Sequence, residues 1–117
     1  MSSSSLLDLH QAGVLSLGPA TEFSSGGIVS RAVLTQPGLR VTLFGFAAGQ
    51  ELTEHATGSR ALIQILTGSC AWTITGEPRT LRAGDLLHLP PGTPHAVRAD
   101  EAFSMLLTLV REAGGPS

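Results

Sequence analysis

Short apolar stretches separated by glycine or proline run through most of this chain. Runs of this length, rich in β-branched and aromatic residues and ended by turn-forming residues, are typical of β-strands joined by tight turns. Helix-like periodicity is scarce. The pattern predicts an all-β chain with strands at Ile28–Leu34, Arg40–Ala47, Glu51–Thr57, Ala61–Leu66, Cys70–Thr75, Arg79–Arg82, Asp85–Leu89, His95–Ala99 and Phe103–Val110.

Two of these segments predict how their faces are covered. Cys70–Thr75 places Trp72 and Ile74 on one side, as a strand with one buried face requires, and Gly76 to Pro78 is expected to form the turn that follows. Phe103–Val110 is apolar on both sides, which indicates a strand covered on both faces by a sandwich interior or a dimer interface.

Length and composition favour one globular domain. The chain has 117 residues, of which 42% are hydrophobic and 14% charged, so it has enough apolar material for one core and too little charge for a disordered tail. We expect a folded domain at 13–112, a flexible N-terminal segment at 1–12 and a flexible tail at 113–117.

The charge pattern and the single cysteine argue against several protein classes. The net charge is −2, and the seven basic residues are arginines spread singly along the chain, so a nucleic-acid surface is not expected. Cys70 alone forms neither an internal disulfide nor a multi-thiolate zinc site, and we expect it to be a small buried side chain. With no basic leader and no long apolar run, a cytoplasmic protein without a membrane segment is expected.

Two glycine-led segments carry histidine at set distances. One spans residues 49–68 and contains His55, and the other spans residues 84–99 and contains His95. Their spacing resembles the two motifs of the cupin superfamily at Gly49, His55, Gly68, Gly84, Pro90, Gly92 and His95. The resemblance implies a small, single-domain, RmlC-like cupin, an antiparallel β-barrel or double-stranded β-helix with jelly-roll topology.

The same resemblance implies a metal site that is only half present. Cupin metals are held by two histidines and a glutamate of the first motif and by the histidine of the second. Here Thr57 stands in place of the second histidine and Ala61 in place of the glutamate, so only His55 and His95 remain. Two imidazoles with open coordination positions suit a divalent transition metal such as iron, zinc, nickel or manganese.

A second interpretation of the histidine pair needs no metal. His55 and His95 can hydrogen-bond each other, a water molecule or a bound organic acid, because an imidazole both donates and accepts. In either case we expect a pocket inside the barrel, with Thr57, Ala61, Phe103 and Met105 in its wall.

Three other polar residues, His88, Gln64 and Asp85, lie near the two motifs in the sequence. A third ligand at His88 would complete a stronger metal site, but a surface or interface histidine is the favoured interpretation. Gln64 has the opposite strand parity to Ala61, so it should face away from the pocket, with a hydrogen bond at an interface as its expected role. Asp85, after a glycine, is expected to accept backbone hydrogen bonds in a turn.

Three hypotheses for function follow. The first is a binding protein for a small organic molecule, with both histidines contacting its polar group. The second is a metal-dependent enzyme, an oxygenase, isomerase or lyase, acting on a small organic substrate. The third is a structural role, in which the barrel is a dimerisation unit or a remnant of a longer regulator. The fold alone does not choose among them, because function resides in the site. A homodimer is the expected assembly.

Overall fold

The computed structural model describes residues 5–112 and confirms an all-β chain. A single-turn helix, α1 (Leu17–Ala20), precedes the strands. The strands are β1 (Ile28–Gln36), β2 (Leu39–Phe46), β3 (Glu51–His55), β4 (Ser59–Thr67), β5 (Ser69–Ile74), β6 (Glu77–Arg82), β7 (Leu86–Leu89), β8 (His95–Arg98) and β9 (Phe103–Arg111). The tail expected at 113–117 and the first four residues of the N-terminal segment lie outside the described residues.

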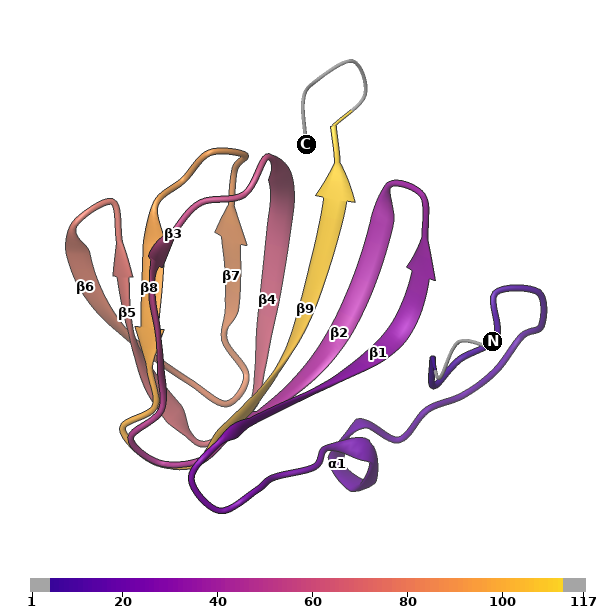
Figure 1. Cartoon of the computed structure of the whole chain (residues 1–117), viewed down its shortest axis with the longest axis horizontal. Helices are drawn as coiled ribbons and strands as arrows, with labels where there is room; N and C mark the ends of the chain where they lie inside the picture. Colours follow the sequence, from indigo (N-terminus) through magenta and orange to yellow (C-terminus); the bar gives the residue numbers. More distant parts are fainter. Residues whose placement is uncertain (1–4, 113–117) are drawn as a thin grey trace.

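The strands form two antiparallel sheets that face each other as the predicted jelly roll. The large sheet has the order β1-β2-β9-β4-β7 and the small sheet the order β3-β8-β5-β6. Figure 1 shows the sheets meeting at one end of the molecule and diverging at the other. The inner faces of the sheets therefore enclose a space that is closed at one end and open at the other.

The closed end is filled by aromatic packing. Phe46 ends β2 and Phe103 begins β9, and they are directly opposed in the β2–β9 pair. Both side chains are fully buried and their ring centroids are 4.5 Å apart in a stacked arrangement. Gly68 lies against this end with a positive φ of 76°, and a Cβ there would collide with the backbone of Ala102. Glycine is thus required where the chain turns beneath the core.

The hairpin between β5 and β6 differs from the prediction. The turn was expected at Gly76 to Pro78, but its central residues are Thr75 and Gly76, both at positive φ, and β6 already begins at Glu77. Pro78 pairs with Thr73 inside β6. Proline is tolerated there because β6 is the edge strand of the small sheet, where a missing N–H breaks no interior ladder.

An N-terminal strap covers part of the outer face of the large sheet. Leu6 and Leu7 donate backbone hydrogen bonds to the carbonyls of Ala32 and Val33 in β1, each at 2.9 Å. Farther along, Glu22 pairs with Arg31 at 3.1 Å. Leu6 and Leu7, which belong to the segment predicted to be flexible, are thus hydrogen-bonded to β1. Within the described residues, no helix is long and apolar enough to cross a membrane.

Candidate functional site

The two predicted histidines meet at the open end of the barrel. His55 is the last residue of β3 and His95 the first of β8, and the two are directly opposed in the antiparallel β3–β8 pair. Their ring centroids lie 4.3 Å apart with an interplanar angle of 58°. Two segments forty residues apart therefore present their imidazoles as neighbours on one face of the small sheet.

Both imidazoles are oriented in the same way by the backbone. The Nδ1 atom of His55 lies 2.9 Å from the carbonyl oxygen of Thr53, and the Nδ1 atom of His95 lies 2.9 Å from that of Thr93. A carbonyl only accepts, so each Nδ1 carries the proton and donates it. In the neutral ring the Nε2 atom is then the unprotonated nitrogen, free to accept a hydrogen bond or to ligate a metal.

The two rings differ in exposure. His95 is 8% exposed, whereas His55 lies at the solvent side of the pair. Burial lowers the pKa of His95 below its ordinary value of 6.5, and the neighbouring His55 lowers it further, against the hydrogen bond to Thr93, which raises it. His95 is therefore a neutral acceptor at neutral pH.

The histidine pair stands in the wall of a cavity of about 240 Å³ between the two sheets. Apart from His55, His95, the Thr57 hydroxyl and the Trp72 indole, the wall is made of Phe44, Leu52, Ala61, Ile63, Val97, Met105, Leu107 and Leu109. Trp72 stacks beside His95 with ring centroids 6.1 Å apart, and its Nε1–H donates to the Cys70 sulfur at 3.2 Å. An almost wholly apolar cavity with two convergent acceptors is typical of a small-molecule site.

Three of the four other residues predicted for this pocket lie in its wall, and one does not. Thr57, Ala61 and Met105 line the cavity together with the histidine pair. Phe103 does not, although it shares its strand face with Met105. It lies at the closed end, where Phe46 fills the space in front of its ring. Strand parity gives the face of a side chain but not its depth in the barrel.

Residues 42–110 match the family model of the cupin domain, which is more than half of the chain and includes both histidines. The chain belongs to the cupin family.

Solved structures similar to this cupin extend over nearly its whole length. A conserved protein of unknown function from Streptococcus pyogenes is 32% identical, with a TM-score of 0.83 over 97% of this chain and 98% of the other. A cupin superfamily protein from Desulfitobacterium hafniense is 26% identical, with a TM-score of 0.82 over 92% of this chain and 98% of the other.

More distant structures share the fold alone. A mutant of salicylate 1,2-dioxygenase from Pseudoaminobacter salicylatoxidans is 21% identical, with a TM-score of 0.67 over 72% of this chain and 26% of the other. No curated protein matches this cupin in sequence. The comparisons therefore establish the fold and the family, and the site must be interpreted from its own residues.

As a metal site, the histidine pair of this cupin offers two donors. In the part of the chain that the structure describes, no cluster of three or more histidine, cysteine, aspartate or glutamate side chains could hold a metal ion. Thr57 and Ala61 face the cavity, but a neutral hydroxyl is a weak ligand and a methyl group is none. The two free Nε2 atoms fit a weakly held divalent ion with open positions better than a tightly held one.

The remaining polar candidates lie outside the cavity. His88 is exposed on the outer face of β7, where its Nε2 atom lies 2.8 Å from a guanidinium nitrogen of Arg60, as a surface histidine was predicted to be. Gln64 is exposed on the same face of β4, away from the pocket as expected. Asp85 accepts the backbone N–H of Arg82 at 2.9 Å, which is the predicted turn role.

Sequence reasoning missed the two carbonyls that orient the imidazoles. Each comes from the residue two positions before the histidine, Thr53 or Thr93. The repeated Thr-X-His pattern is visible in the sequence. Because the acceptor is a backbone atom, however, the threonine side chains carry no signal of this role.

Proposed function

We propose that this cupin binds a small organic molecule in the cavity between its sheets, with His55 and His95 contacting a polar group of the ligand. The observation that carries this proposal is the pair of free Nε2 acceptors in an otherwise apolar wall. A hydroxyl or N–H group of the ligand supplies the donor that these atoms lack. The cavity of about 240 Å³ corresponds to roughly eight water molecules of liquid volume, which limits the ligand to small molecules.

The chain carries its own probe for this proposal. Trp72 is the single tryptophan and it lines the cavity, so its indole N–H gives one signal in a proton–nitrogen correlation spectrum. We expect small hydroxylated aromatic or aliphatic molecules to shift this signal saturably. Ala61→Leu, which fills the cavity from β4, should abolish the shift.

Histidine variants then test which group the ligand contacts. His55→Ala and His95→Ala should each weaken the binding of the molecules found, by the roughly tenfold that a hydrogen bond of about 1.4 kcal/mol represents. His88→Ala, on the outer face, is the matched control and should leave binding unchanged. If no small molecule shifts the Trp72 signal, or if the Ala61→Leu variant binds as well as the parent, the proposal fails.

A metal-dependent enzyme acting on a small organic substrate is the second candidate. The Nδ1 hydrogen bond that both imidazoles make favours it, because metal-ligating histidines commonly donate their other N–H to a backbone carbonyl in this way. Iron, zinc, nickel or manganese on the two Nε2 atoms would keep positions open for water and substrate.

Elemental analysis distinguishes the two candidates. If the enzyme hypothesis holds, protein purified without chelator carries or takes up a stoichiometric metal ion, and His55→Ala or His95→Ala loses it. No copurified metal and none gained on titration would refute it. Binding of organic molecules to the metal-free protein would still support the first proposal.

We also propose that this cupin forms a homodimer through the outer face of the large sheet. Leu86 of β7, Leu62 of β4 and Val110 of β9 are 66%, 38% and 37% exposed on that face. These strands are adjacent and the three side chains follow a diagonal across the face, with Gln64 and His88 beside them. Exposed apolar side chains grouped in this way favour an interface. Light scattering should give twice the chain mass, and Leu62→Glu should give a monomer.

A further inference from the structure

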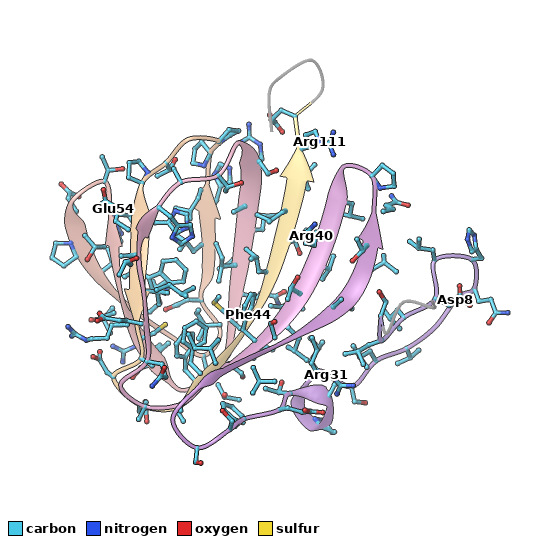
Figure 2. All side chains as sticks on the ribbon, viewed as in Figure 1. Asp8, Arg31, Arg40, Phe44, Glu54 and Arg111 are labelled. Atoms are coloured by element: carbon cyan, nitrogen blue, oxygen red, sulfur yellow. The ribbon has the colours of Figure 1, made fainter. Side chains whose placement is uncertain are left out.

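Arg40, which has no side-chain partner among residues 5–112, lies on the inner face of the large sheet, close to the cavity. The side chains of β2 alternate, and Phe44, Thr42 and Arg40 line one hollow on the inner face. Figure 2 shows Arg40 nearer than Phe44 to the open end. Arg40 is directly opposed to Leu109 of β9, and Leu109 is in turn opposed to Ala61 of β4. Both of these neighbours line the histidine cavity.

The spacing of the strands places the Arg40 backbone beside the wall of this cavity. Adjacent strands are about 4.8 Å apart, so the Arg40 backbone is about one strand from the Leu109 wall and about two from Ala61. An arginine side chain is long enough to cover that distance. Arg40 lines two hollows beside the cavity rather than the cavity itself, and its side chain can extend to the cavity mouth.

Arg111 lies on the same face, one step farther toward the open end. It is two residues from Leu109, which makes it the diagonal neighbour of Arg40 across the β2–β9 pair. The two arginines border a hollow of about 250 Å³ that shares Thr57 and Leu109 with the histidine cavity. The hollow and the cavity therefore adjoin at these two residues.

The charges of this hollow are all of one sign. Its wall contains the two arginines and the hydroxyls of Thr35, Thr57 and Ser59, but no aspartate or glutamate. Among residues 5–112, neither arginine makes a side-chain hydrogen bond or ion pair, whereas Arg31, Arg60 and Arg98 are each paired with a carboxylate. Two unpaired guanidiniums beside hydroxyl donors are complementary to an anion, above all to a planar carboxylate.

We propose that the ligand of this cavity is a small amphipathic carboxylic acid. Its carboxylate lies between Arg40 and Arg111, its apolar body lies against Trp72 and Leu109, and a hydroxyl or N–H group at its far end donates to the histidines. The inference rests on the proposed binding function and adds the charge and the orientation of the ligand. Binding is noncovalent and no bond is formed or broken.

A matched pair of probes tests the carboxylate directly. Para-hydroxybenzoate and its neutral amide, para-hydroxybenzamide, have the same shape and differ in charge. We expect the acid to bind at least tenfold more tightly than the amide, with the Trp72 indole signal as the measure of binding. Raising the salt concentration should weaken the binding of the acid and leave the binding of the amide unchanged. The arginines are solvent-exposed, so salt screens their attraction for the carboxylate.

Variants then assign the charge to its source. Arg40→Gln should lower the affinity for the acid by roughly tenfold and leave the affinity for the amide unchanged. Arg111→Gln should change the two affinities in the same direction. Arg82→Gln, at the end of the exposed edge strand β6, removes the same charge at a position paired with Ser69, outside both the cavity and the hollow, and is the matched control. Because Arg40 has no partner in the structure, Arg40→Gln should fold with unchanged or slightly higher thermal stability.

Each other outcome overturns a distinct part of the inference. If acid and amide bind equally and Arg40→Gln changes neither, the carboxylate site is wrong while the binding function stands. If the acid binds at Arg40 but Ala61→Leu leaves its affinity unchanged, the arginine hollow is separate from the cavity and the orientation is wrong. If neither probe shifts Trp72 in the parent protein, the carboxylate proposal fails, and the binding function then depends on the wider set of small molecules.

Discussion

His55 and His95 are directly opposed cross-strand partners whose Nδ1 atoms are each held at 2.9 Å by the carbonyl two residues earlier. The two rings are thus turned by the same local geometry, although β3 and β8 are distant in sequence. Their free Nε2 atoms are the polar features that distinguish the cavity wall from a purely apolar core. A positive charge on one ring disfavours a positive charge on the other.

The stability of the metal-free protein should decrease as the pH falls below 6.5. Burial lowers the pKa of His95 in the folded state, so just below the ordinary value of 6.5 the unfolded chain binds the proton more readily than the folded one. The contribution of His95 to stability is then fully present above pH 6.5 and is lost as the pH falls through the pKa that His95 has in the folded state. Denaturant titrations across this range measure it.

A pair of variants isolates the contribution of His95 to this pH dependence. His95→Gln should flatten the pH dependence of the unfolding free energy, whereas His88→Gln should retain it, because His88 is exposed on the outer face. If the unfolding free energy of His95→Gln depends on pH as steeply as that of the parent protein, other groups cause the loss of stability at low pH.

The sequence predicts the fold well because the fold depends on turn-forming residues that can be recognised locally. Glycine and proline end the strands at the places where a closed barrel needs turns, and alternation within the strands identifies Trp72 and Met105 as inward-facing. The predicted breaks are mostly within a few residues of the observed ones. The β5–β6 turn was misplaced because Pro78 looks like a turn residue, whereas an edge strand tolerates it.

The candidate site is less accessible to sequence reasoning. The motif spacing identifies His55, His95, Thr57 and Ala61, but the depth of Phe103 depends on how the two sheets converge. Arg40 was not recognised because its position at the cavity edge follows from the pairing of β2 with β9 and of β9 with β4. These pairings join segments that are distant in the chain, and no local pattern records them.

Restoring the two missing ligands should create a strong metal site. Thr57 and Ala61 line the same cavity as the histidine pair, so the double variant Thr57→His with Ala61→Glu adds an imidazole and a carboxylate toward the free Nε2 atoms. Losing a residue that merely hydrogen-bonds a metal ligand lowers metal affinity by roughly 10–100-fold. Because the double variant adds two direct ligands, we expect its affinity for zinc or nickel to rise by more than that. Calorimetric titration of the metal-free variant measures it.

The double variant Thr57→Val with Ala61→Leu is the matched control, since it alters the same two positions without adding a donor. Equal zinc affinity in this control and in the four-ligand variant would show that the two positions do not converge on the histidines.

Replacing Thr75 by asparagine should stabilise the protein by roughly 0.5–1 kcal/mol. Thr75 has a φ of 49°, which is unfavourable for a β-branched residue, and it is followed by Gly76 at 82°. Asparagine before glycine is the preferred pair for a two-residue hairpin turn of this kind. The Thr75 N–H that donates to the carbonyl of Pro94 at 2.9 Å is retained.

Chemical denaturation of Thr75→Asn and Thr75→Val measures this strain. Thr75→Val keeps the β-branch and should not be stabilised. A destabilised Thr75→Asn would show that the threonine side chain contributes more to the turn than its backbone strain costs.

Truncation of Phe103 should destabilise the protein without changing the ligand site. Phe103 is fully buried and stacked on Phe46 at the closed end, so Phe103→Ala leaves an internal void and should cost about 3–5 kcal/mol of unfolding free energy. Phe103→Leu fills most of that void and keeps the fold if the alanine variant unfolds. In the Phe103→Leu protein, para-hydroxybenzoate should bind with parental affinity.

Phe44 provides the contrasting position. It lies on the same sheet, half-buried, but lines the histidine cavity, so Phe44→Leu should change the affinity for para-hydroxybenzoate while costing less stability than Phe103→Ala. The two variants separate the filled closed end of the barrel from its open, ligand-accessible half. If Phe103→Leu altered the affinity as much as Phe44→Leu, the cavity would extend past Phe46, and Phe103 would belong to its wall as the strand pattern first suggested.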